Sequence, residues 1–142
     1  ELNSEENVKD GMDIALCCIN KKTLFYSGAN NPLWIIRKET DTVQEFKADK
    51  LPIGRHDISF PYNTHEIPIN KGDSIYIFSD GFADQFGGDR GKKYKTKQFK
   101  DFLVSICKKE ITIQQQLIQE EFKRWKGENE QIDDVCVMGI RV

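Results

Sequence analysis

Short apolar runs separated by polar clusters dominate the first half of the chain, and this pattern predicts β-strands. The expected strands cover residues 14–19, 23–27, 33–37, 43–46, 64–69 and 75–78. Turn-forming residues, such as Asn20-Lys21-Lys22, lie between them. We expect the first four strands to form an antiparallel meander, beginning with a hairpin of residues 14–19 and 23–27.

The run 75–78 is predicted to be a central strand, because its alternation puts apolar side chains on both faces. Ile75 and Ile77 would face one side, and Tyr76 and Phe78 the other. Asp80 and Gly81 follow directly, so the Asp80 carboxylate is expected at the carboxyl end of this strand. Residues 82–86 could then begin a helix or a helical turn.

Two amphipathic helices are expected after this strand. The first begins near Thr96, a possible cap, and the second begins with Thr112 and Gln115 as a capping box and stops at Gly127. Their apolar faces consist of Phe99, Phe102, Leu103, Ile106 and Cys107, and of Ile113, Leu117, Ile118, Phe122 and Trp125. A last strand over residues 135–142 completes an α+β domain.

Composition adds few constraints. The 142 residues suit one domain, and the formal net charge of -2 gives no general attraction to nucleic acid or anionic membranes. No apolar run is long enough to cross a membrane. The four cysteines lie within apolar runs at positions 17, 18, 107 and 136, and are expected to be buried thiols of a reduced, cytoplasmic protein.

Acidic residues flank two of the predicted buried strands. Asp80 follows one, and Asp133 and Asp134 precede another. If these strands are antiparallel neighbours, the carboxylates meet at one rim of the sheet. Grouped carboxylates suit hard cations such as Mg²⁺ or Mn²⁺, although acids at strand ends are more often turn formers, caps or solvated groups.

Other chemistries have less support. No cysteine is followed six positions later by arginine, which excludes a cysteine-dependent phosphatase motif within this chain, and His56 and His65 are isolated. The segment 87–93 lacks the spacing of a phosphate loop and is interpreted as a mobile loop near Asp80. Residues 92–97 are basic, which allows contact with a phosphate-bearing partner, but a solvated approach to the helix is the simpler interpretation.

Several motifs, taken in order, resemble the SpoIIE-like branch of the metal-dependent type 2C serine/threonine phosphatases. They are Asp10-Gly11-Met12, Ser27-Gly-Ala-Asn-Asn-Pro-Leu33, Leu51-Pro-Ile-Gly54, Gly72-Asp73, Ser79-Asp80-Gly81 and Asp133-Asp134-Val135. The resemblance implies a mainly antiparallel sheet, half of a β-sandwich, with the two helices packed on it. It also implies a metal site formed by Asp80, the carbonyl of Gly81, and Asp133, with Asp134 and Asp10 in structural roles.

The resemblance further implies two Mn²⁺ or Mg²⁺ ions in a complete domain and hydrolysis of phosphoserine or phosphothreonine by metal-activated water. The implied substrate is a phosphorylated anti-anti-sigma-type protein of bacterial partner switching, with sensor or receiver domains upstream. The implied location is the cytoplasm. The alternative is a non-catalytic regulatory or dimerisation module that retains the fold.

One family feature is absent: no Asp is followed shortly by Gly-His-Gly or Gly-Lys-Gly. Residues 1–142 are therefore expected to be a single, incomplete phosphatase domain that lacks the first metal motif, its hairpin and two helices. We expect weak metal binding and no activity from this segment alone. We also expect that an uncovered side of the sheet pairs with a second copy, as a homodimer, or promotes association.

Overall fold

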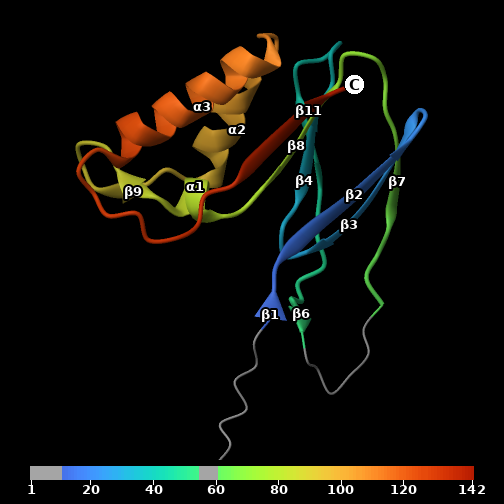
Figure 1. Cartoon of the computed structure of the whole chain (residues 1–142), viewed down its shortest axis with the longest axis horizontal. Coiled ribbons are helices and arrows are strands. Elements are labelled where there is room, and N and C mark those ends of the chain that lie inside the picture. Colours follow the sequence, from blue (N-terminus) through green and yellow to red (C-terminus); the bar gives the residue numbers. More distant parts are fainter. Residues whose placement is uncertain (1–10, 55–60) are drawn as a thin grey trace, which may run out of the picture.

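The computed structural model describes residues 11–54 and 61–142, which form two antiparallel sheets packed face to face, with helices on one outer side (Figure 1). The first sheet has the order β2 (Ile14–Asn20), β3 (Thr23–Ala29) and β7 (His65–Pro68). The second has the order β11 (Val137–Arg141), β8 (Ser74–Phe78), β4 (Leu33–Ile36) and β5 (Val43–Phe46). The predicted α+β class is confirmed.

Strand β8 lies between β11 and β4, as its pattern predicted, and separates two hydrophobic cores. Ile75 and Ile77 face the core between the sheets, where they join Leu24 and Ile67 of the other sheet. Tyr76 and Phe78 belong to the core beneath the helices. The strict alternation of the strand therefore supplies side chains to both cores.

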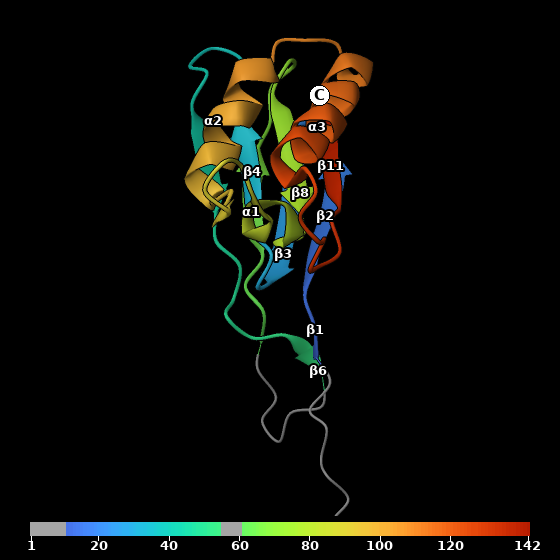
Figure 2. The same cartoon turned by 90° about the vertical axis from the view of Figure 1, so that its left-hand side faces the viewer.

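Three helices cover the outer face of the four-stranded sheet. They are α1 (Gly81–Asp84), α2 (Thr96–Ile106) and α3 (Ile111–Lys126), and Figure 2 shows α2 and α3 in front of the strands. Aromatic rings join these layers: the rings of Phe82 and Phe99 stack with centroids 4.4 Å apart. Gly127 ends α3 with a positive φ of 52°, which confirms the predicted stop.

The predicted helix caps are wrong. Lys95 and Glu110 are the N-cap residues of α2 and α3, and neither makes a side-chain cap hydrogen bond. Thr112 and Gln115 lie inside α3 rather than at its start. The start of α3 is fixed by packing instead: the buried Gln114 accepts a 2.6 Å hydrogen bond from the Tyr76 hydroxyl. Long-range contacts of this kind override a local capping signal.

The predicted meander is also wrong, because β3 and β4 lie in different sheets. Residues 30–32 carry the chain from one sheet to the other, and β3 pairs with β2 and β7. Residues 51–54, expected to be a compact turn, contribute β6 (Ile53–Gly54), which pairs with β1 (Gly11–Met12). The segment interpreted as a mobile loop contains an antiparallel pair, β9 (Phe86–Gly87) and β10 (Lys92–Lys93).

Burial of all four thiols is not observed: Cys107 is buried and Cys17 is half-buried, but Cys18 and Cys136 are exposed. The exposed thiols lie on or beside β2 and β11, which are edge strands. Met138 and Ile140 of β11 are exposed as well, by 51% and 36%. In residues 11–54 and 61–142, no helix is long and apolar enough to span a membrane.

Candidate metal centre

The candidate site begins where strand β8 ends. Asp80 lies two residues beyond the strand and is the N-cap residue of α1, with right-handed helical φ and ψ angles and no side-chain cap bond. Its side chain is exposed at the rim of the sheet. The backbone of Asp80 accepts the hydrogen bond from the Asp84 N–H that closes the helical turn, with a length of 3.0 Å.

Strand β11 brings the second acidic spot to the same rim. The two strands are antiparallel, and Val137 lies opposite Phe78 in their register. The residues before β11 therefore run alongside the residues after β8. The two strands are thus antiparallel neighbours, which is the condition under which the sequence brings their carboxylates to one rim, and Asp133 lies on the rim that carries Asp80.

Ser79 and Gly81 fix the approach of the two segments. The Ser79 hydroxyl donates to the Asp134 carbonyl at 2.8 Å and accepts from the Cys136 N–H at 2.9 Å. A Cβ at Gly81 would lie 2.3 Å from the Asp134 carbonyl oxygen. Only glycine allows this close approach. The Ser79-Asp80-Gly81 sequence therefore makes a turn and also lets the backbone at Asp134 pack against it.

Electrostatics show that the rim concentrates negative charge. Partial desolvation, followed by the nearby carboxylates of Asp133, Asp84 and Asp13, raises the pKa of Asp80 above its ordinary value. Asp133 is exposed, and its carboxylate accepts a hydrogen bond from the Asp134 N–H at 2.7 Å.

Two of these neighbours, Asp84 and Asp13, were not identified from the sequence. Asp84 lies four positions after Asp80 in a helical turn, so the helical spacing could have indicated it. Asp13 lies directly before β2 and accepts a 2.7 Å hydrogen bond from the Asn30 side chain. Its proximity depends on the packing of the two sheets, which no local pattern reveals. Asp10 and His56 lie outside the described residues.

The donor chemistry at this rim fits a hard divalent cation. Only oxygen ligands are offered here, by Asp80, the Gly81 carbonyl and Asp133. The neighbouring carboxylates repel the negative charge of ionised Asp80, and a bound cation would offset that repulsion. Within the described ranges, however, no three Asp, Glu, His or Cys side chains are grouped closely enough to hold an ion. The rim therefore offers oxygen donors that suit such a cation, but the described residues do not form a complete ligand set.

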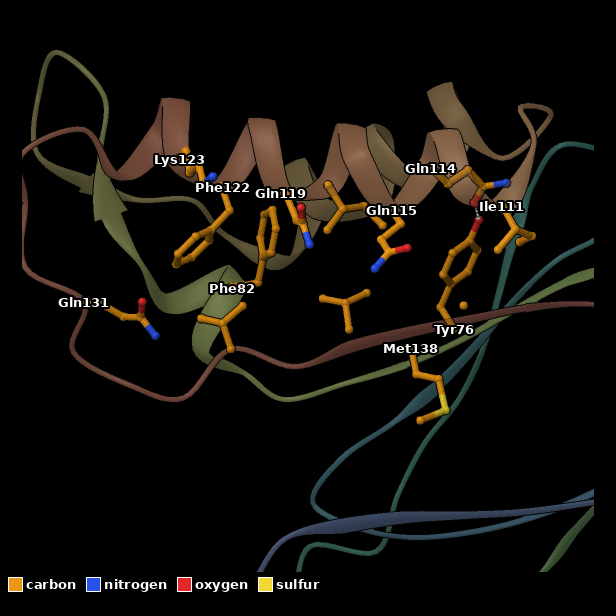
Figure 3. A pocket seen from close by; sticks show the side chains of 14 residues that line it. Tyr76, Phe82, Ile111, Gln114, Gln115, Gln119, Phe122, Lys123, Gln131 and Met138 are labelled. Carbon is orange, nitrogen blue, oxygen red and sulfur yellow. Dashed lines mark hydrogen bonds between the residues drawn. The ribbon is translucent and has the colours of Figure 1, made fainter.

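A groove of about 550 Å³ runs between α3 and β11 and reaches the rim (Figure 3). Its floor is apolar, with Tyr76, Phe82 and Val137. Gln115 and Gln119 of α3 line its other side. Gln131, at the end of the groove nearest the acidic residues, donates to the Asp133 carbonyl at 2.9 Å.

Solved structures that match this fold include PP2C and phosphatase domains of bacterial proteins. The SiaA PP2C domain of Pseudomonas aeruginosa matches with a TM-score of 0.74 and 28% identity, over 85% of this chain and 47% of that one. The phosphatase domain of SpoIIE from Bacillus subtilis, presoaked with Mn, matches with a TM-score of 0.66 and 18% identity, over 92% of this chain and 56% of that one. PppA, a key regulatory component of T6SS in Pseudomonas aeruginosa, matches with a TM-score of 0.64 and 12% identity, over 92% and 57%.

The chain belongs to the SpoIIE family, since the family model for stage II sporulation protein E matches residues 5–142. It spans about half the length of the solved domains that it matches. No curated protein matches it. The sequence-based recognition of a SpoIIE-like PP2C phosphatase fold is confirmed. The metal ligands, the incomplete domain and the homodimer stay predictions.

Proposed function

We propose that this chain forms part of a metal-dependent protein phosphatase that hydrolyses phosphoserine or phosphothreonine in a regulatory protein of bacterial signalling. The observation that carries the proposal is the register between β8 and β11, which sets Asp80 and Asp133 on one rim. Membership of the SpoIIE family supports it.

In this proposal, Asp80, the Gly81 carbonyl and Asp133 hold Mn²⁺ or Mg²⁺, with two ions in the complete site. The bound cation would supply positive charge that attracts the phosphate group and acidifies water. Ser79 keeps the two segments in place through its two hydrogen bonds. In the reaction, a water oxygen bonds to phosphorus, the bond from phosphorus to the Ser or Thr oxygen breaks, and that oxygen takes the proton.

The proposed substrate is a phosphorylated anti-anti-sigma-type protein, and the proposed setting is the cytoplasm, under the control of sensor or receiver domains. The similarity to the SiaA PP2C domain and the SpoIIE phosphatase domain supports the coarser part of the proposal, a phosphatase-type domain in bacterial regulation. This segment on its own is proposed to be inactive.

The second candidate is a non-catalytic module that retains the phosphatase fold. The observation in its favour is that three metal-ligating side chains do not converge anywhere in residues 11–54 and 61–142. In that case, Asp80 and Asp133 would be solvated residues at strand ends.

Phosphate release from phosphoserine and phosphothreonine peptides separates the two candidates. The full-length protein is assayed with Mn²⁺ or Mg²⁺ and again after chelation with EDTA. The phosphatase predicts metal-dependent release that falls at least about a hundredfold in Asp80→Asn and Asp133→Asn, since each substitution removes a metal ligand. Asp101→Asn, an exposed substitution on α2 with the same charge change, is the control. Absence of metal-dependent release would favour the non-catalytic module. Equal metal-dependent release in all variants would instead refute Asp80 and Asp133 as metal ligands.

A further inference from the structure

A basic surface borders the acidic rim. It consists of Arg90, Lys92, Lys93, Lys95 and Lys97, all exposed. We call it the basic hairpin because Arg90, Lys92 and Lys93 lie in the β9–β10 hairpin, and the other two follow it directly. Residues 89–97 hold these five cations against a single carboxylate, that of Asp89, although the whole chain has a net charge of -2. Five of the 21 lysines and arginines of the chain therefore lie in this one stretch, whose backbone contacts α1.

Most of this charge is uncompensated. Lys93 pairs with Asp84 at 3.0 Å, but in the part of the chain that the structure describes no ion pair involves the other four cations. These side chains therefore break no ion pair within the described residues when they bind a partner. They are available for contacts with an external anion.

Backbone hydrogen bonds join the end of the basic hairpin to α1 and to the residue after it. The Tyr94 N–H donates to the Gln85 carbonyl at 3.0 Å, and the Lys95 N–H donates to the Ala83 carbonyl at 2.7 Å. The Tyr94 ring is buried, and its hydroxyl donates to Glu121 at 2.8 Å. Because α1 begins directly after Asp80, these bonds hold the backbone that carries the basic side chains next to the rim.

Lys95 is unfavourable for local folding. Its φ is 75°, in a region that side chains other than glycine rarely adopt, and it occupies the N-cap of α2, where Ser, Thr, Asp or Asn is preferred. A cation there also opposes the helix dipole. Folding alone therefore gives no reason for lysine at this position.

We infer that the basic hairpin is the docking surface for the phosphorylated regulatory protein, which it binds through acidic residues that flank the phosphorylated Ser or Thr. The inference rests on the proposed function. The charge arrangement fits a partner with locally grouped acids, because Asp80, Asp84 and Asp133 beside the basic hairpin would repel a continuous polyanion such as nucleic acid or an anionic membrane. Electrostatic docking of this kind mainly increases the association rate constant of the substrate and thereby lowers KM.

Binding of fluorescent phosphoserine peptides tests this inference without any turnover. Fluorescence anisotropy is measured in EDTA, with one peptide flanked by Asp and Glu and another of equal length flanked by Gln and Ser. The acidic peptide is expected to bind more tightly, and added salt is expected to weaken its binding selectively. Combining Lys92→Gln, Lys95→Gln and Lys97→Gln should weaken it roughly tenfold and leave the neutral peptide unchanged.

The matched control combines Lys21→Gln, Lys22→Gln and Lys71→Gln, three exposed lysines at the far ends of β2 and β8 from the acidic rim. It should bind the acidic peptide as the wild type does. Equal losses for both peptides, equal losses in both triple variants, or tighter binding of an oligonucleotide or a phosphatidylserine vesicle would each overturn the inference. Failure of the phosphatase assay alone would leave this binding result intact and would refute only the proposed reaction.

Discussion

Two aspartates flank strand β8, and their environments are opposite. Asp73, before the strand, is only 3% exposed at its side chain and accepts hydrogen bonds from the Arg37 guanidinium and from the N–H groups of Lys38 and Asn70. Asp80, after the strand, is exposed beside other carboxylates. The hydrogen bonds and the ion pair of Asp73 balance its negative charge within the fold, whereas Asp80 adds its charge to a group of other carboxylates.

The pKa shifts express the same contrast. Burial alone would raise the pKa of Asp73, but hydrogen bonds from Asn70, Arg37 and Lys38 outweigh it, so the pKa of Asp73 lies below its ordinary value. Desolvation and like charges raise the pKa of Asp80. The fold therefore stabilises the ionised form of Asp73, as expected of a structural residue. It disfavours the ionised form of Asp80, as expected of a residue that binds a ligand.

The largest expected effect is the loss of stability in Asp73→Ala. It leaves Arg37 without its ion-pair partner and two N–H groups without acceptors, which should lower the free energy of unfolding by about 3 kcal/mol. Asp80→Ala should leave stability unchanged or raise it, because it removes repulsion. Guanidinium chloride unfolding of both variants measures the difference. Equal destabilisation of the two would refute the contrast.

A smaller effect is expected at Gly81, where the rim depends on close packing. Gly81→Ala would push its Cβ against the Asp134 carbonyl and should lower the free energy of unfolding by about 2 kcal/mol. The same displacement should move Asp133, with a change in the amide NMR signals of residues 133–136. Unchanged stability together with unchanged signals would show that the two segments are not in contact.

The two aspartates should also respond oppositely to acid. Because the folded-state pKa of Asp73 is lowered, its contribution is complete above its unfolded pKa of about 3.9 and is lost as the pH falls through the folded value. The stability difference between wild type and Asp73→Asn should therefore shrink below about pH 4. Protonation of Asp80 instead relieves repulsion, so its effect has the opposite sign. Chemical unfolding at a series of pH values checks both, and a constant difference for Asp73→Asn would contradict this account.

The features of this contrast that depend on neighbouring residues in the chain could be predicted from the sequence. The short apolar run of β8 with Ser79-Asp80-Gly81 after it predicts a buried strand and an acid at its end, and the alternation within the run predicts its central place. The resemblance supplies Asp133 as the partner of Asp80.

The remainder depends on contacts between distant segments. In the sequence, Asp73 is indistinguishable from an ordinary turn residue after Gly72, because its partner Arg37 directly follows a distant strand, β4. The sandwich in place of a meander, and the approach of Asp13 to the rim, likewise arise from the packing of two sheets. Cys18 and Cys136 have apolar neighbours but lie on or beside edge strands, so a hydrophobic pattern alone could not predict their exposure.

We propose that the rim at Asp80 binds a hard divalent cation, and Mn²⁺ binding measured by electron paramagnetic resonance tests this assignment most directly. The titration compares the wild-type chain with Asp80→Asn and with the control Asp101→Asn. We expect weak binding in the wild type and in the control, and an affinity at least about tenfold lower in Asp80→Asn, because even residues that only support metal ligands contribute that much. Equal Mn²⁺ affinity in Asp80→Asn and Asp101→Asn would contradict the assignment of Asp80 as a metal ligand.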